Sequence, residues 1–513
     1  MKPMKNYATS LPVVGSLPIC NCQSPIGRNF LESLAPCLDL LSNIRFLNRQ
    51  TAIGNRQWPR ILVALLVSLV WLQQPAIVGA QKRPEEIPKP PVSTTTPTAP
   101  ISPSQITTDQ AESASAESQV MYGLQGVLVE SLDGKTVAAQ SAEENFNPAS
   151  AIKLATALVA LRTFGPQHRF TTGIWITGTF DKVTGTLSGN LYISGRDPSF
   201  HYEHGVMIAR QLNTLGIRTV TGNLVVAPGF TMNFNWSARR SGEQLYDTFD
   251  STLRPGEASR AWLYERTALG DHASLQTIPS VAVMGAVEVN PVAADAKLVL
   301  SQKSSKLVDI LKVLLCYSNN FMAERLGDSV GGLQSVRRQL TNSLGLSSSG
   351  FMISSLSGLG VNRVSPQTMM KIFRALREEL RKNKLSTTDI MPVAGIDPGT
   401  LQDRFTGPAW RASVIAKTGT LIRTDGGVSS LVGQMKTAGG ETLLFVIMNR
   451  QGSVLRFRLN QDHLVMQIQN SRGGPKAFDY KPHLLAMKLA DTQSLSSAGD
   501  EYEPVLKRAL SSP

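Results

Sequence analysis

Three short motifs, which follow one another in a fixed order, constrain what this chain can fold into more than any other feature. They are Ser150-Ala-Ile-Lys153, Ser318-Asn-Asn320 and Lys417-Thr-Gly419, in the patterns S-x-x-K, S-x-N and K-T-G. Each pattern alone is common and carries little information. Together they specify an acylatable serine with two lysines, a second hydroxyl and an amide around it. The fold must therefore bring three distant segments to one site.

The segment after Ser150 is rich in Ala and Leu, which predicts a helix that ends at Gly165. Ser150 stands at the helix start, where serine is a favoured cap, and Lys153 follows one turn later on the same face. If burial or a second cation lowered its pKa, the Lys153 amine could accept the Ser150 proton, and Lys417 would be that cation. The alternative is a capping serine beside a solvated lysine.

Ser318 to Asn320 interrupt an apolar, helix-like stretch at 307–326, and short polar side chains weaken a helix by competing for backbone groups. The functional interpretation is a hydroxyl that passes a proton to a leaving amine and an amide that holds a substrate backbone. Tyr317-Ser-Asn319 also fits Y-x-N, so the register is open at this point. A local bend or a polar helix face is the alternative.

The run that ends at Lys417 is β-prone, and Gly-rich turns at 425–427 and 438–440 separate it from two further apolar strands. This pattern predicts an antiparallel meander with Lys417 on an edge strand. Gly419 would let a substrate backbone approach closely, and the N–H groups of Ser150 and Thr420 would form an oxyanion hole. The alternative is a strand lysine followed by a turn.

Longer matches surround the motifs, and through them the chain resembles the D-alanyl-D-alanine carboxypeptidase/endopeptidase family of low-molecular-mass penicillin-binding proteins. The similarity covers roughly 120–470 and favours the Ser318 register. It is carried by Pro148-Ala-Ser-x-x-Lys153, Ser318-x-Asn320-x-x-Ala-Glu324, Ser357-Gly-Leu with Asn362-Arg-Val, Pro392-Val-Ala-Gly with Gly399-Thr-Leu and Arg404-Phe, and Gly195-Arg-Asp-Pro. Arg196 departs from the family's G-G-D-P turn.

The resemblance implies a serine DD-peptidase that acts on the D-Ala-D-Ala end of peptidoglycan stem peptides and is acylated by β-lactam inhibitors. No cofactor or metal is expected. The implied catalytic residues are Ser150 as nucleophile, Lys153 as base, Ser318 with Lys417 as the route of a proton to the leaving amine, and Asn320 at the substrate backbone. The implied substrate-binding residues are Thr418, which receives the terminal carboxylate, Gly419 and Thr420.

The resemblance also implies an α+β, penicillin-recognising serine transpeptidase-like fold. This fold has a five-stranded antiparallel sheet with helices, a helical lobe and, here, a small β-rich insert domain. A hairpin at 127–139 and the three strands around Lys417 should make the sheet, with a helix at about 455–469 packed on it. Two similar segments, which begin at Leu187 and Val220, supply strands of the insert.

The expected division of the chain follows from composition and from the motifs. It is a leader with a signal peptide or membrane anchor (1–80), a disordered Pro/Ser/Thr-rich linker (81–118), a catalytic domain (119–180 and 281–470), an insert domain (181–280) and a C-terminal tail (471–513). The apolar run at 61–72 is short for a spanning helix, and Val78-Gly-Ala80 fits signal cleavage. An exported protein of the periplasm or cell envelope is expected, and retention of the apolar segment would associate it with the membrane.

The net charge of +13 suits an anionic cell wall, although an ordinary soluble surface explains it equally well, and no motif indicates nucleic-acid binding. Cys316 is the one cysteine after the leader, which excludes an internal disulfide in the processed chain, and its apolar neighbours predict a buried thiol. His201 and His204 could share a helix face, but no third metal ligand is evident, so we expect a surface pair.

Three classes of function compete. A DD-peptidase uses every motif residue, whereas a β-lactamase-like hydrolase of class A type needs a deacylating Glu in an E-x-x-L-N string that the sequence lacks. A non-catalytic wall-binding scaffold would not need both lysines and both serines. The motifs therefore favour the peptidase and leave its carboxypeptidase or endopeptidase preference open.

Overall fold

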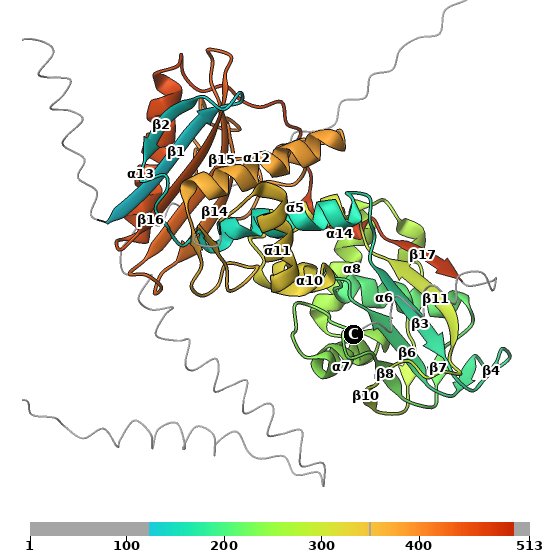
Figure 1. Cartoon of the computed structure of the whole chain (residues 1–513). Helices are drawn as coiled ribbons and strands as arrows, with labels where there is room; N and C mark the ends of the chain where they lie inside the picture. Colours follow the sequence, from blue (N-terminus) through green and yellow to red (C-terminus); the bar gives the residue numbers. More distant parts are fainter. Residues whose placement is uncertain (1–122, 348–349, 497–513) are drawn as a thin grey trace, which may run out of the picture. The chain divides into compact units, whose positions relative to one another are not determined.

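The computed structural model describes residues 123–347 and 350–496 of the 513-residue chain. All of them fall within one compact unit. The leader expected at 1–80 and the linker expected at 81–118 lie outside the described residues. Figure 1 shows the two largest sheets of this unit as separate, each with helices packed on it.

Five antiparallel strands form the first sheet, in the order β14-β15-β16-β1-β2. They are β14 (Val414–Leu421), β15 (Val428–Lys436), β16 (Thr442–Arg450), β1 (Leu124–Ser131) and β2 (Thr136–Gln140). The prediction of a sheet built from the first hairpin and the three strands around Lys417 is therefore confirmed. The strand that carries Lys417 lies at the sheet edge.

Both faces of this sheet are buried, which explains why β16 is apolar at nearly every position. Successive side chains of a strand point to opposite faces. Phe445 packs in one cluster with α13 (Val454–Asn470), as expected for a helix at about 455–469. Val446 packs in another cluster with α5 (Lys153–Phe164) and α12 (Pro366–Lys382), and Figure 1 shows α12 lying across the sheet.

The helical lobe continues with α9 (Leu307–Tyr317), α10 (Asn320–Ser329) and α11 (Gly332–Leu344). The predicted weakening of the helix near Ser318 is a complete break. Ser318 adopts a left-handed conformation with φ of 56°, and the Asn319 side chain accepts a hydrogen bond from the Met322 N–H. Asn319 thus caps the new helix, as short polar side chains commonly do.

The second sheet has the order β10-β8-β6-β3-β11-β17 and extends beyond 181–280, the range expected for the insert. Its strands are β3 (Thr171–Ile176), β6 (Leu191–Gly195), β8 (Leu224–Val226), β10 (Val287–Val289), β11 (Lys297–Lys303) and β17 (Gln493–Ser496). Because β3 pairs with β11, the continuous segment that supplies every strand of this sheet except β17 runs from Thr171 to Lys303.

The two similar segments of the insert are parallel neighbours, and each is interrupted by a Gly-Asn pair. The Gly222 N–H donates to the Gly189 carbonyl at 3.0 Å, and the Gly285 N–H donates to the Gly222 carbonyl at 3.0 Å. A Cβ at Gly222 would lie 2.5 Å from the Gly189 carbonyl oxygen, so the contact requires glycine. The short strands β5 (Thr186–Ser188) and β7 (Thr219–Val220) precede the two Gly-Asn pairs, and β9 (Ala282–Val283) precedes Gly285. Together with β4 (Thr179–Asp181) they form a small sheet in the order β4-β5-β7-β9.

Helices are also part of the insert, which sequence patterns had indicated only as β-rich. These are α6 (Tyr202–Thr214), α7 (Ala238–Phe249) and α8 (Gly256–Ala268). Leu212 and Leu245 join the buried cluster of the second sheet, so α6 and α7 cover one of its faces. The remaining short elements are η1 (Ala149–Ile152), η2 (His272–Leu275), η3 (Thr387–Asp389), β12 (Phe351–Met352) and β13 (Arg363–Val364).

The chain after 470 packs on the helical lobe through α14 (Leu485–Ala490) and on the second sheet through β17. Lys488 of α14 pairs with Asp309 of α9 at 2.7 Å. Strand β17 pairs antiparallel with β11 of the second sheet. The part of the tail that the structure describes is therefore a packed segment.

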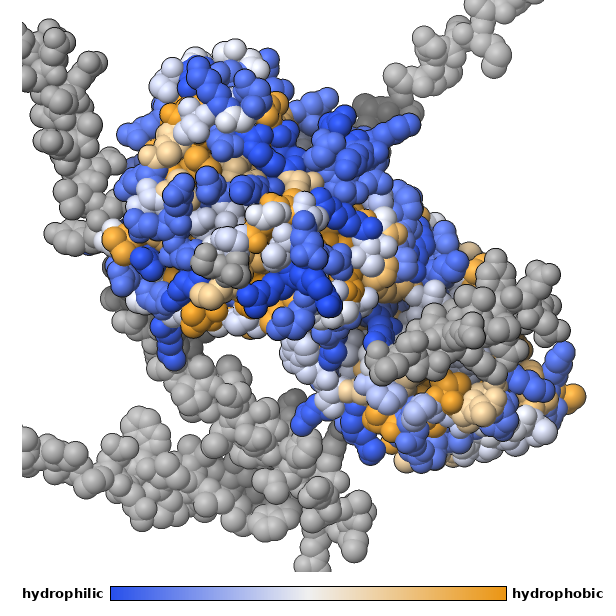
Figure 2. All heavy atoms as spheres, viewed as in Figure 1, coloured by the Kyte–Doolittle hydropathy of each residue, from blue (hydrophilic) through white to orange (hydrophobic). Residues whose placement is uncertain are grey.

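Hydrophilic side chains predominate on the face of the unit shown in Figure 2, and hydrophobic ones form small patches among them. Within 123–347 and 350–496, no helix combines the length and the apolar character that crossing a bilayer requires. Cys316 is buried, as expected, and burial raises the pKa of its thiol to about 12.

A buried ion pair ties α9 to the segment that precedes β14. The Lys312 amine donates to Asp397 Oδ2 at 2.6 Å and to the Met391 carbonyl at 2.7 Å, and both charged side chains are 1% exposed. The other carboxylate oxygen of Asp397 accepts from the Tyr480 hydroxyl at 2.6 Å. Removing one partner of such a pair leaves a buried charge without compensation.

We therefore predict that Asp397→Asn lowers the free energy of unfolding by about 3–5 kcal/mol, because Lys312 stays buried without a counter-charge. Urea unfolding measures this change. The control is Glu243→Gln, which removes an exposed ion pair with Arg239 and should cost no more than about 1 kcal/mol. A loss below about 1 kcal/mol in Asp397→Asn would contradict the proposed role of the pair.

Candidate active site

The first motif lies where a 3-10 turn passes into a buried helix. Ser150 belongs to η1 rather than capping an α-helix, since α5 begins three residues later at Lys153. The Lys153 Nζ donates a hydrogen bond to Ser150 Oγ at 2.9 Å. The spacing of the motif thus brings amine and hydroxyl together as predicted.

Lys153 is fully buried, and three acceptors hold its amine. Besides Ser150 Oγ, these are Asn320 Oδ1 at 2.7 Å and the Ser357 carbonyl. Burial lowers the pKa of Lys153 to about 7, and the nearby Glu324 carboxylate opposes part of that effect. A substantial fraction of the amine is therefore neutral near pH 7 and able to accept a proton.

The second serine and the second lysine form a similar pair. The Lys417 Nζ donates to Ser318 Oγ at 2.9 Å and to the Thr418 carbonyl at 2.7 Å. Burial and, to a lesser degree, the Lys153 charge hold the pKa of Lys417 well below its ordinary value. The left-handed turn at Ser318 directs its hydroxyl to Lys417, whereas Tyr317 is about half exposed.

Gly419 has a packing role besides the one expected, which stays a prediction. A Cβ there would lie 2.4 Å from the Pro148 carbonyl oxygen, so this glycine admits the turn that carries Ser150 and not only a substrate backbone. Ser430 Oγ, from the neighbouring strand, donates to the same carbonyl at 2.6 Å. The Thr420 hydroxyl accepts from Arg458, and the oxyanion hole stays a prediction.

The Ser-Gly-Leu segment forms the wall opposite β14. Gly358 has φ of +90°, and a Cβ there would lie 2.1 Å from the Ala149 carbonyl oxygen. The Arg363 guanidinium donates to both carboxylate oxygens of Asp425 at 2.9 Å, and the Asn147 amide reaches the same carboxylate at 3.2 Å. These contacts fasten the wall to the loop after β14.

Several of these partners were not predicted as site residues. The Ser357 carbonyl is a backbone group, which no side-chain pattern reports. Ser430 and Asp425 belong to no motif, and their partners are distant in the sequence. A signal existed for Arg363 and Glu324, because both lie in the longer family matches, but it gave them no role.

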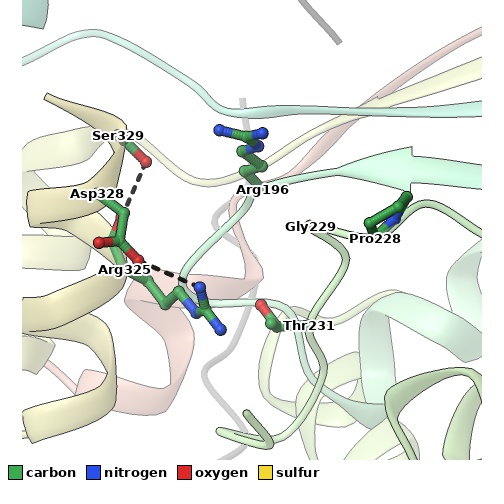
Figure 3. A pocket seen from close by; sticks show the side chains of 7 residues that line it. All are labelled: Arg196, Pro228, Gly229, Thr231, Arg325, Asp328 and Ser329. Carbon is green, nitrogen blue, oxygen red and sulfur yellow. Dashed lines mark hydrogen bonds and ion pairs between the residues drawn. The ribbon is translucent and has the colours of Figure 1, made fainter. Parts of the chain in front are cut away.

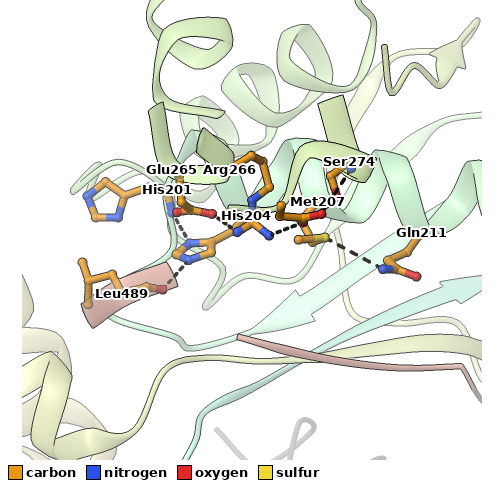
Figure 4. A network of polar contacts seen from close by, with 9 residues as sticks. His201, His204, Met207, Gln211, Glu265, Arg266, Ser274 and Leu489 are labelled. Atoms are coloured by element: carbon orange, nitrogen blue, oxygen red, sulfur yellow. Dashed lines mark hydrogen bonds and ion pairs between the residues drawn. The ribbon is translucent and has the colours of Figure 1, made fainter. Parts of the chain in front are cut away.

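His201 and His204 do not form the expected surface pair, because His204 is buried. Its Nδ1 accepts from the His201 N–H at 2.9 Å, and its Nε2 lies 3.2 Å from the Leu489 carbonyl (Figure 4). Since a backbone N–H only donates and a carbonyl only accepts, Nε2 carries the proton. Both ring nitrogens are thus engaged, so the group His201, Glu203 and His204 does not offer a metal three free ligands.

A cavity of about 290 Å³ lies between the insert and the C-terminal half of α10 (Figure 3). Its lining comprises Arg196, Pro228, Gly229, Thr231, Arg325, Asp328 and Ser329. Arg325 pairs with Asp328 at 3.1 Å and lies over the Trp236 ring. The cavity is lined by none of the residues of the S-x-x-K, S-x-N and K-T-G motifs.

The chain is similar in sequence to one curated relative and in fold to solved structures. The chain is 26% identical over 422 residues to a D-alanyl-D-alanine carboxypeptidase of Actinomadura sp. (strain R39), which covers 63% of this chain and 77% of the relative. The penicillin G-acylated predatory endopeptidase Bd3459 of Bdellovibrio bacteriovorus is similar in structure, with a TM-score of 0.60, 23% identity, and coverage of 71% of this chain and 97% of that one. Penicillin-binding protein 4 of Haemophilus influenzae is also similar in structure, with a TM-score of 0.51 and 21% identity. The match covers 67% of this chain and 97% of that one.

The two solved structures share the fold, and the family assignment rests on the sequence. The sequence profile of the D-Ala-D-Ala carboxypeptidase 3 (S13) family matches residues 108–238 and 274–467, which is more than half of the chain. The chain therefore belongs to the D-Ala-D-Ala carboxypeptidase 3 (S13) family.

Proposed function

We propose that Ser150 is the nucleophile of this serine DD-peptidase and that Lys153 is its base. The observation that carries the proposal is the pair of buried amines, each hydrogen-bonded to one serine hydroxyl. A lysine that is largely neutral near pH 7 is a competent proton acceptor, since the best catalytic pKa lies near the working pH. Acylation should therefore become faster as pH rises through the pKa of Lys153.

In the proposed acylation, Ser150 Oγ bonds to the penultimate carbonyl carbon while its proton moves to Lys153 Nζ. The tetrahedral oxyanion would be held by the N–H groups of Ser150 and Thr420. The C–N bond then breaks, and the departing D-Ala amine takes a proton from the Ser318 hydroxyl. Lys417, in its protonated form, returns a proton to Ser318, so that over the acylation the positive charge passes from Lys417 to Lys153. Water later hydrolyses the acyl-enzyme and restores the Ser150 hydroxyl.

Substrate binding is assigned to the residues around the two pairs. Asn320 Oδ1 is occupied by Lys153, so its Nδ2 is the group left to donate to a substrate carbonyl. Thr418, with Lys417, would bind the terminal carboxylate of D-Ala-D-Ala. Gly419 and Thr420 would align the stem peptide along the edge of β14. Cross-linked stem peptides present a similar bond, so endopeptidase activity is included in the proposal.

β-Lactams are the expected inhibitors, because they present a strained amide to the same nucleophile. Support comes from the fold shared with Bd3459, whose structure is described as acylated by penicillin G. The β-lactamase-like alternative lacks the E-x-x-L-N string. The scaffold alternative gives no reason to bury two lysines, because burying an amine costs free energy and a scaffold gains nothing from it.

The proposed place of action is the cell envelope, with peptidoglycan as the partner. The export signal read at 61–80 supports it, and the positive net charge of +13 suits an anionic wall polymer. Cleavage in the periplasm or retention as a membrane anchor are both consistent with that leader. No nucleic-acid partner is proposed.

Ser150→Ala is predicted to abolish covalent labelling by penicillin, because no other group would complete the attack. Mass spectrometry of the intact protein after incubation with penicillin, followed by tryptic mapping, measures the adduct. The wild type should carry one adduct on the Ser150 peptide. An adduct on Ser318, or one that persists in Ser150→Ala, would overturn the assignment of the nucleophile.

The second serine is tested separately from its neighbour. Ser318→Ala should slow acylation by about 10²–10⁴-fold, because the leaving nitrogen loses its proton donor. Tyr317→Phe, one residue away, should acylate at nearly the wild-type rate and serves as the matched control. The opposite ranking in stopped-flow acylation with a chromogenic β-lactam would favour the Y-x-N register.

A further inference from the structure

Glu324 lies one helical turn after Asn320 on α10 and takes no part in the proton transfers proposed above. Its Oε1 accepts from the Ser357 N–H at 2.8 Å and from the Leu356 N–H at 3.2 Å. Residues four apart on a helix share a face. Asn320 and Glu324 therefore face the same neighbouring segment, one through Lys153 and the other through backbone amides.

The backbone carbonyls of Leu356 and Ser357 accept hydrogen bonds from side chains of α5. Thr156 Oγ1 donates to the Leu356 carbonyl at 2.9 Å, and Lys153 Nζ donates to the Ser357 carbonyl. Leu356 and Ser357 are both buried. A two-residue segment is thus clamped between α10 and α5, with Glu324 on one side and Lys153 on the other.

The clamp determines where the Lys153 amine points. Its three acceptors come from three elements, namely the η1 turn (Ser150), α10 (Asn320) and the clamped segment (Ser357). Without Glu324 the two peptide N–H groups would lose their acceptor in a buried place, and the peptide would be free to rotate. The Ser357 carbonyl would then no longer fix the amine beside Ser150.

The negative charge of Glu324 gives this residue a second role. Burial disfavours the protonated form of Lys153, and the Glu324 carboxylate favours it. The other charged group that faces this site is Lys417 of β14, which is coupled to Lys153 with like charge. Glu324 is thus the negative charge that acts on an amine which must become positive when it takes the Ser150 proton.

We propose that Glu324 is a positioning residue of the reaction, which clamps the Leu356–Ser357 backbone so that Lys153 is aimed at Ser150 and which balances the charge that Lys153 acquires. The proposal rests on the proposed function of Ser150 and Lys153. It assigns a chemical reason to the last residue of the Ser318-x-Asn320-x-x-Ala-Glu324 match.

The test measures how the rate of acylation by one chromogenic β-lactam depends on pH. It compares the wild type, Glu324→Gln and Asp328→Asn. Glu324→Gln keeps the shape and one acceptor oxygen but removes the charge. Without that charge the pKa of Lys153 falls further, so the acidic limb of the profile should move to lower pH while the plateau rate drops. Asp328→Asn, which removes an exposed carboxylate from the same helix, should leave limb and plateau unchanged.

Glu324→Ala removes the clamp as well, and a displacement of about 1 Å at a reacting group typically costs on the order of 10²-fold in rate. Glu324→Gln should recover part of that loss, provided circular dichroism shows both variants folded. If Glu324→Ala is unfolded, the shift of the limb in Glu324→Gln still decides the matter. The proposal would be overturned if the acidic limb of the pH–rate profile of Glu324→Gln lay at the same pH as that of the wild type. A wild-type rate of acylation in Glu324→Ala would also overturn it.

These outcomes are separable from failure of the proposed function. Acylation of the wild type at Ser150 tests the function, whereas only the difference between wild type and the Glu324 variants tests the clamp. A wild type that is not acylated would overturn both proposals. An acylated wild type with unchanged variants would overturn the clamp alone.

Discussion

The structure depends on burying two lysine amines beside two serine hydroxyls. A buried amine loses its hydration, so its neutral form becomes accessible near physiological pH. Here Lys153 and Lys417 are both 0% exposed, and each keeps hydrogen-bond acceptors that replace water. The coupling between the two amines further disfavours a second positive charge. Much of the surrounding fold excludes water from the two lysine amines and holds each amine in line with its serine hydroxyl.

Three structural devices hold the pairs in place. The left-handed break at Ser318 turns one hydroxyl toward β14. Two glycines, Gly358 and Gly419, allow the turn that carries Ser150 to contact both walls of the site at distances no Cβ would permit. The Glu324 clamp joins the helical lobe to the Ser-Gly-Leu wall. Each device comes from a different segment, which is why the motifs are so far apart in the sequence.

Local signals were sufficient for much of this arrangement. The first hairpin and the three strands around Lys417 follow from strand propensity and turn residues. Helix propensity predicted a weakened helix near Ser318, which the structure shows as a complete break. The register at Ser318 rested on the longer family match, and the structure places the Ser318 hydroxyl beside Lys417. The roles assigned to the motif residues remain predictions, although their side chains converge as expected.

Other features depend on contacts that are distant in the sequence. Strands β3 and β11 lie more than a hundred residues apart and pair with each other, and no local signal in the sequence indicates this pairing. The docking of β17 on β11 gave no local signal either. Backbone acceptors such as the Ser357 carbonyl carry no side-chain signature. His204 contacts the carbonyl of Leu489, which lies 285 residues away in the sequence, so no local pattern indicates that contact.

The central claim is that burial makes Lys153 a base near neutral pH, and titration of that amine tests it most directly. Lysine labelled with ¹³C and ¹⁵N would be followed by NMR against pH, with the Lys153 signal assigned through its loss in Lys153→Arg. The account predicts a titration midpoint of about 7 for Lys153. A midpoint at the ordinary lysine value of about 10.4 would contradict it, because the amine would then be protonated throughout the range in which the enzyme is expected to work.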